Sequence, residues 1–194
     1  MRSKTEMTVI FLRTGTRRYA VEVKRPAYTD LEMNPAPGYD ALMPHDLMHL
    51  VVESQLGLSH AIFGQLAAGG DAGTFRLIMK ENWTSLAGAR IRRRVKTKGR
   101  HLMRAGKKEC AESERATFIC WREWLERSRG APARSAASKQ VRTTTSTSKL
   151  RALDSRKMEE ICRHLDELSS RWSKLEIGQS IAVRWPDLAV SSDA

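Results

Sequence analysis

Residues 7–25 read MTVIFLRTGTRRYAVEVKR, and this stretch predicts the start of a β-sheet. Residues 7–12 are rich in strand-forming side chains, and residues 19–25 alternate apolar and polar side chains as a half-buried strand does. Thr14-Gly15-Thr16 between them supplies turn residues. The sequence therefore predicts a β-hairpin near the beginning of the chain.

The chain after this hairpin carries the signals of a loop and then of two helices. Residues 26–43 contain three prolines, a glycine and an asparagine, which predict a loop. Pro44 suits the start of a helix over residues 45–56, and Gly57 suits its end. A second, short helix is predicted from a Ser59 cap to residue 68, and residues 74–79 fit a strand.

The second half of the chain alternates basic, helical and linker-like segments. Residues 88–108 are dense in Arg and Lys and are interrupted by three glycines, and residues 108–128 have the periodicity of an amphipathic helix. Residues 129–148 are rich in Ala, Ser and Thr and predict a disordered linker. A long helix over residues 149–175 and a strand over residues 180–185 follow.

These elements predict an α+β fold. We expect a small antiparallel or mixed sheet, made of the N-terminal hairpin plus the C-terminal strand, with helices on one face and a basic, partly disordered insertion. Residues 1–80 and 149–194 then form one discontinuous domain. Residues 81–128 add the basic segment and the amphipathic helix, and residues 129–148 are the linker.

Composition and charge narrow the class of protein. The net charge is +12, and it is uneven: residues 1–80 carry a net +1 and residues 81–194 a net +11. There is no apolar run of the roughly 20 residues that a membrane span needs, and no signal-peptide pattern at the start. Three cysteines at unrelated spacings fit neither a disulfide framework nor a metal knuckle. We therefore expect a cytoplasmic protein.

The segment with the most recognisable chemistry is the predicted helix that carries His45, Asp46 and His49. Two histidines four residues apart share a helix face and can bind one metal ion, here zinc, iron or manganese, with Asp46 as a general base. Glu53 is too far along the helix axis to be a ligand and is expected to orient His49, so a third ligand has to come from elsewhere, such as His60 or Asp71. The competing interpretation is a core-packed helix with two ordinary histidines.

A second candidate site is the basic segment. It has no acidic residue between Glu81 and Glu109, and it suits contact with phosphates, especially if residues 91–98 form a strand with its cations on one face. It contains no interleaved aromatic residue for base stacking and matches no zinc finger or RNP motif. A solvated insertion is the alternative. The candidate polyanion-binding residues are Arg90, Arg92, Arg93, Arg94, Lys96, Lys98 and Arg100.

Two segments, HDLMHLVVE at residues 45–53 and GQSIAVRWP at residues 178–186, resemble a family of uncharacterised bacterial proteins. The resemblance covers roughly residues 7–80 and 150–186 and leaves residues 88–148 as the variable part. No activity is known for that family, so the resemblance implies neither a reaction nor a ligand. It favours one discontinuous domain over two independent ones.

The sequence alone does not determine the function. The leading hypothesis is a non-enzymatic binding protein that contacts nucleic acid or another polyanion through residues 90–108. The alternative is a metal-binding protein or metal-dependent hydrolase that uses His45 and His49. No membrane partner is expected, and self-association through the apolar seam of residues 158–175 is not favoured.

Overall fold

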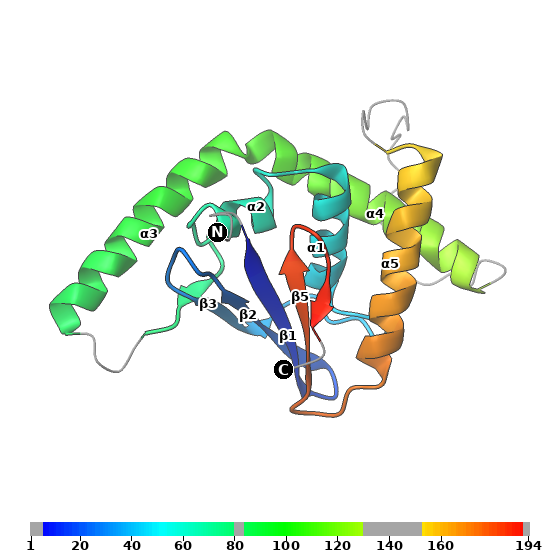
Figure 1. Cartoon of the computed structure of the whole chain (residues 1–194), viewed down its shortest axis with the longest axis horizontal. Coiled ribbons are helices and arrows are strands. Elements are labelled where there is room, and N and C mark those ends of the chain that lie inside the picture. Colours follow the sequence, from blue (N-terminus) through cyan, green and yellow to red (C-terminus); the bar gives the residue numbers. More distant parts are fainter. Residues whose placement is uncertain (1–5, 80–83, 130–152, 192–194) are drawn as a thin grey trace.

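A computed structural model describes residues 6–79, 84–129 and 153–191, and it confirms the α+β class. One antiparallel sheet has the strand order β4-β3-β2-β1-β5-β6 (Figure 1). Its strands are β1 Met7–Gly15, β2 Arg18–Lys24, β3 Leu31–Ala36, β4 Arg76–Leu77, β5 Ser180–Trp185 and β6 Val190–Ser191. The helices are α1 His45–Leu56, α2 Ile62–Ala67, α3 Ser85–Ala105, α4 Lys107–Arg129 and α5 Ser155–Ser173.

The predicted hairpin and the predicted C-terminal strand form the middle of this sheet. β1 pairs with β2 on one side and with β5 on the other. Val9 lies opposite Val23 and Val183, and all three side chains are buried. The alternation of side chains thus gives the sheet one apolar face, which the helices cover. The last predicted strand of the chain therefore does pair with its first.

The predicted loop over residues 26–43 is wrong in part, because it contains β3. Leu31 and Met33 of β3 are buried opposite Val23 and Val21, so the segment alternates as a strand does. Pro35, which argued against a strand, lies where the pairing with β2 is irregular and beyond the residues that pair with β4. A proline is tolerated at such a position because no ladder hydrogen bond needs its missing N–H. The C-terminal tail likewise contributes β6, which was not predicted.

The helix over residues 45–56 is confirmed, with Gly57 at its C-terminus in the left-handed conformation (φ +66°). The second helix is shorter than predicted and is not capped by Ser59. α2 begins after Ala61, and its first N–H groups donate to the carboxylate of Glu53, from Ile62 at 3.3 Å and from Phe63 at 2.8 Å. A side chain of α1 thus caps α2, which local sequence signals do not reveal. Only residues 76 and 77 of the predicted strand over 74–79 are extended as β4.

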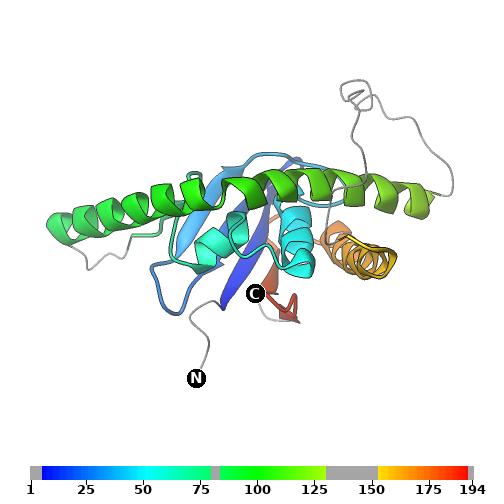
Figure 2. The same cartoon turned by 90° about the horizontal axis from the view of Figure 1, so that it is seen from above.

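The basic segment is a helix, and the strand considered for residues 91–98 is wrong. Arg and Lys are good helix formers, and the Thr84 hydroxyl accepts a hydrogen bond from Ala87 N–H as an N-terminal cap. Gly88 and Gly99 do not interrupt α3; they are its buried residues. Viewed from above, α3 and α4 follow one another along the long axis of the molecule (Figure 2).

The two predicted C-terminal helices are confirmed as α4 and α5. The apolar seam of α5 is buried within the fold, at Ile161, Leu165, Leu168 and Trp172, and Trp124 of α4 donates to Asp166 of α5 at 2.7 Å. The predicted linker lies, except for Arg129 at the end of α4, outside the described residues, as does the start of the predicted helix at residues 149–152. In the described part of the chain, no helix is long and apolar enough to cross a membrane.

Candidate nucleic-acid interface

The cations of the basic segment line the solvent-facing side of α3. Six of the seven candidate residues are exposed: Arg90, Arg92, Arg93, Arg94, Lys96 and Arg100. The seventh, Lys98, is partly buried. Across residues 6–79, 84–129 and 153–191, no acidic side chain forms an ion pair with a Lys or Arg of α3. Within the described residues, the exposed cations of this helix therefore face solvent without an ion-pair partner.

A narrow inner face attaches α3 to the rest of the molecule. A Cβ atom added at Gly99 would lie 2.0 Å from Asp71 Oδ1, and one at Gly88 would lie 2.4 Å from the end of Met79. Leu102 lies against Gly70, where an added Cβ would be 2.9 Å from its side chain. These glycines let α3 approach the body closely. Because only this face is packed, the opposite face is exposed to solvent.

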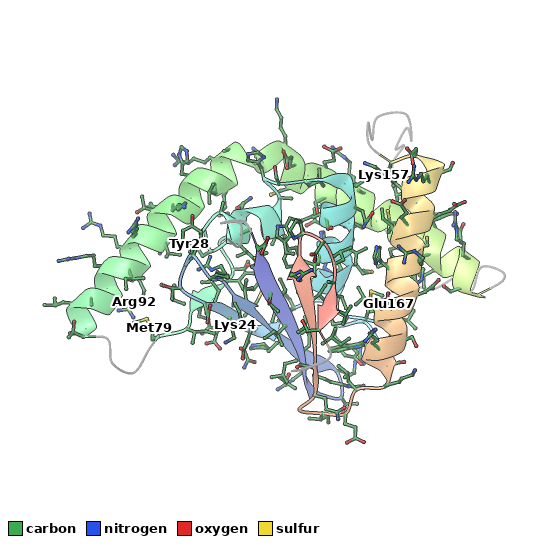
Figure 3. The ribbon with its side chains drawn as sticks, in the orientation of Figure 1. Lys24, Tyr28, Met79, Arg92, Lys157 and Glu167 are labelled. Atoms are coloured by element: carbon green, nitrogen blue, oxygen red, sulfur yellow. The ribbon has the colours of Figure 1, made fainter. Side chains whose placement is uncertain are left out.

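The dimensions of α3 match an extended anionic partner. Its 21 residues make a rod about 31 Å long at 1.5 Å per residue. Double-stranded DNA carries about one negative charge per 1.7 Å of its axis, and an α-helix fits its major groove. Figure 3 labels Arg92 near the N-terminal end of the helix, beyond the edge of the sheet. The arrangement can contact several phosphates of one strand or duplex at once.

The histidine pair on α1 has a different environment. His45 is exposed, His49 is 2% exposed, and their ring centroids are 4.6 Å apart. His60 pairs with Glu109 at 3.0 Å, and Asp71 lies against α3, so neither completes a ligand set. Within the described residues, no three His, Cys, Asp or Glu side chains gather in a way that could hold a metal ion. The metal site and the hydrolase that depends on it stay predictions from the sequence.

Asp46, the candidate general base, is engaged elsewhere. Its carboxylate lies 2.5 Å from the hydroxyl of Tyr19, a fully buried residue of β2. Burial raises the pKa of Asp46, against the lowering effects of the Tyr19 hydrogen bond and of His45. Burial likewise raises the pKa of Tyr19. The contact ties the first turn of α1 to the sheet, which is a structural role.

His49 belongs to a buried polar network between α1 and α4. Its Nδ1 lies 2.9 Å from Ser113 Oγ, and Ser113 donates to Glu53 Oε1 at 2.8 Å. Thr117 Oγ1 is 3.3 Å from the same ring nitrogen. Glu53 therefore orients His49 through Ser113 and does not hydrogen-bond to the ring directly. The sequence predicted the orienting role of Glu53 but not the serine between the two side chains.

Burial dominates the titration of this network. It lowers the pKa of His49 to about 4, with a further contribution from His45. It raises the pKa of Glu53 to about 8, although hydrogen bonds from Phe63, Ser113 and Ile62 act in the opposite direction. At neutral pH His49 is uncharged and the carboxyl of Glu53 is largely protonated. Together these groups join α1, α2 and α4 without a buried charge.

One residue near α3 was missed by reasoning from the sequence. Tyr28 lies in the turn between β2 and β3, 36% exposed, and the ammonium of Lys98 lies 4.6 Å from its ring centroid. The basic segment itself contains no aromatic residue, but the fold brings one to it from 70 residues away. Its signal in the sequence is only an aromatic residue inside a predicted loop.

Comparison with known proteins finds no matching family model, no similar curated protein and no similar solved structure.

Proposed function

We propose that this protein is a non-enzymatic nucleic-acid-binding protein whose binding surface is the outer face of α3. The observation that supports the proposal is the uncompensated charge of that helix: its candidate cations are exposed, save for the partly buried Lys98, and within the described residues none of them pairs with an acid. Folded proteins usually intersperse both signs of charge on a surface helix. A helix with cations alone gains most from an anionic partner.

The chemistry of these side chains favours contact with the phosphate backbone. Phosphate contacts release condensed counterions, so the observed affinity falls steeply with salt, with a slope of about −0.9 per neutralised phosphate on duplex DNA. Such contacts carry no base sequence information. The protein therefore binds many sequences with similar affinity.

Fluorescence anisotropy with a labelled DNA duplex, repeated at several salt concentrations, tests the proposal. Replacing Arg90, Arg93 and Arg100 by alanine removes three exposed charges from α3 and keeps its helix propensity. We expect the affinity at about 0.1 M salt to fall at least roughly tenfold and the salt slope to become shallower by about 2 to 3.

The matched control removes the same charge elsewhere. Lys157, Arg163 and Lys174 lie on α5 or at its end, and their replacement by alanine lowers the net charge equally. We expect the affinity of this variant to stay close to that of the parent protein. Equal losses in the two variants would show attraction by net charge alone, and no loss in the α3 variant would exclude this helix as the surface.

For the compartment, we propose a reducing cytoplasm. The three cysteines are free thiols, with Cys120 and Cys162 buried and Cys110 partly buried. Proteins of oxidising compartments usually pair their cysteines in disulfides. The same compartment contains the nucleic acid that the proposal requires.

A further inference from the structure

A cleft of about 600 Å³ lies between α3 and the turn that joins β2 to β3. Ile91 and Val95 supply its apolar wall on the α3 side, and Arg94 and Lys98 supply cations from the same helix. The turn contributes Pro26 and Tyr28. The cleft thus combines an aromatic ring, an apolar wall and two cations one helical turn apart. Figure 3 labels Tyr28 on the side of α3 that faces the sheet.

The turn that carries Tyr28 is attached to the body of the protein by a buried arginine. Arg25, 4% exposed, donates to the carbonyl of Thr29 in the turn and to those of Leu66 and Gly70 near the end of α2, the last at 2.7 Å. Gly69 has φ +90°, and a Cβ atom there would lie 2.7 Å from the Tyr28 ring. The buried arginine anchors the turn, and the absence of a side chain at Gly69 leaves room for the ring. Because the turn is anchored, the ring loses less conformational freedom when it binds a flat partner.

The ring of Tyr28 lies next to cations that suit a nucleotide. The ammonium of Lys98 lies 4.6 Å from the ring centroid and donates to the Tyr28 hydroxyl at 3.3 Å. Arg94, one turn before Lys98, is exposed at the rim of the cleft. A lysine over an exposed ring is weakly held, whereas stacking of a base on an aromatic ring is stronger. A base can therefore displace the ammonium, which then lies close to the phosphates that flank the base.

We propose that this cleft binds an unpaired base of single-stranded nucleic acid on the Tyr28 ring, with the flanking phosphates at Arg94 and Lys98. A duplex holds its bases stacked and paired, so the ring gains nothing from one. The site makes the surface of α3 prefer single strands, and it rests on the proposed function of that surface. The alternative is a purely structural role, in which the contact of Tyr28 with Lys98 attaches α3 to the body. The test has to separate the two roles.

The test compares a labelled single strand of about 16 nucleotides with the duplex of the same sequence in the same buffer. Tyr28→Leu keeps an apolar side chain and removes the ring, and Tyr28→Phe keeps the ring and removes the hydroxyl that Lys98 contacts. Phe118→Leu, an equivalent change at a 46% exposed position of α4 outside the cleft, is the control. Thermal unfolding of each variant shows whether the fold is kept.

We expect Tyr28→Leu to lower the affinity for the single strand about tenfold or more and to leave the affinity for the duplex unchanged. Tyr28→Phe and Phe118→Leu should bind both probes as the parent does. If Tyr28 only attaches α3 to the body, Tyr28→Leu should lose affinity equally for both probes, and Tyr28→Phe should lose affinity too. Either that result or unchanged binding by Tyr28→Leu would overturn the proposed base-binding cleft. The proposed function of α3 would not be affected. A parent protein that binds neither probe overturns both proposals.

Discussion

At the scale of single residues, the most unusual group is the carboxyl of Glu53. It is completely buried, yet three hydrogen-bond donors surround it: the N–H groups of Ile62 and Phe63 and the hydroxyl of Ser113. This one side chain thereby accepts hydrogen bonds both from the first N–H groups of α2 and from the buried hydroxyl of α4. Its removal would leave several buried donors unpaired at once, and each unpaired group costs about 1–3 kcal/mol.

Glu53→Gln tests this role through the pH dependence of stability. The pKa of Glu53 is raised to about 8 from an ordinary value of 4.5, so the folded protein holds this proton more tightly than the unfolded chain does. The protonated Glu53 carboxyl therefore stabilises the folded protein fully below pH 4.5, and this stabilisation is lost as the pH rises through about 8. His49, with its pKa lowered to about 4 from 6.5, has the opposite dependence at lower pH, and it contributes little slope above pH 6.5.

We expect Glu53→Gln to lower the free energy of unfolding by about 1–3 kcal/mol at pH 6.5, because its amide N–H₂ has to face a donor that Glu53 accepts from. The difference from the parent should shrink towards pH 8.5, where the parent has to bury a charge. Urea unfolding at the two pH values measures both. Glu167→Gln, at an exposed carboxylate of α5, should show no such pH-dependent difference. A deficit of the same size at both pH values would mean that Glu53 is ionised throughout this range.

At the scale of elements, the local signals of the sequence predicted some segments and not others, for identifiable reasons. The β1–β2 hairpin and α1 were predicted because their turn residues, caps and periodicity lie within the segments themselves. β3 was missed because its proline lies at an irregularity that only the pairing with β2 creates. Two of the glycines in the basic segment were misinterpreted: Gly88 and Gly99 mark close contacts with other segments, whereas Gly106 does end α3.

The residues of the candidate site were likewise predicted where the signal is local and missed where it is not. The cations of α3 were predicted because they lie close together in the chain, and their exposure follows from their charge. The aromatic residue beside them was not, because Tyr28 and Lys98 are 70 residues apart and meet only through packing of the turn against the helix. The same holds for Ser113, which lies 64 residues from His49. Contacts of this kind have no pattern within a single sequence.

The joint between α3 and α4 allows a prediction at this scale. Gly106 has φ −84°, which any residue adopts, so alanine there meets no backbone strain and improves helix propensity. However, its Cβ would lie 2.0 Å from the carbonyl oxygen of His60, a backbone atom that cannot turn aside. We expect the steric effect to dominate and Gly106→Ala to lower stability by about 1–3 kcal/mol, as overpacking does. Urea unfolding measures this change in the free energy of unfolding, and Lys107→Ala at the adjacent exposed position is the control. A Gly106→Ala variant more stable than the parent would show that the backbone around the joint can shift to accept the methyl group.

At the scale of the whole molecule, the sheet joins distant parts of the chain. β1 is its central strand and pairs with β2 from the N-terminal hairpin and with β5, which lies some 170 residues later. The seam of α5 packs against α1 and α4, with Leu165 and Trp172 almost completely buried. The N-terminal and C-terminal segments therefore share one core. The discontinuous domain stays a prediction.

Cutting the chain between its two parts tests that domain. With a protease site introduced within residues 130–152, cleavage should leave the two fragments bound to each other, because β5 remains paired with β1 and the α5 seam remains buried. Size-exclusion chromatography then shows a single species of the parent's size. Leu165→Asp, which places a charge in the buried seam, should release the C-terminal fragment after cleavage, whereas Arg163→Asp on the exposed side of the same helix should not. Fragments that separate without any substitution would mean that the pairing of β5 with β1 and the burial of the α5 seam do not hold the two parts together, which would contradict the single domain.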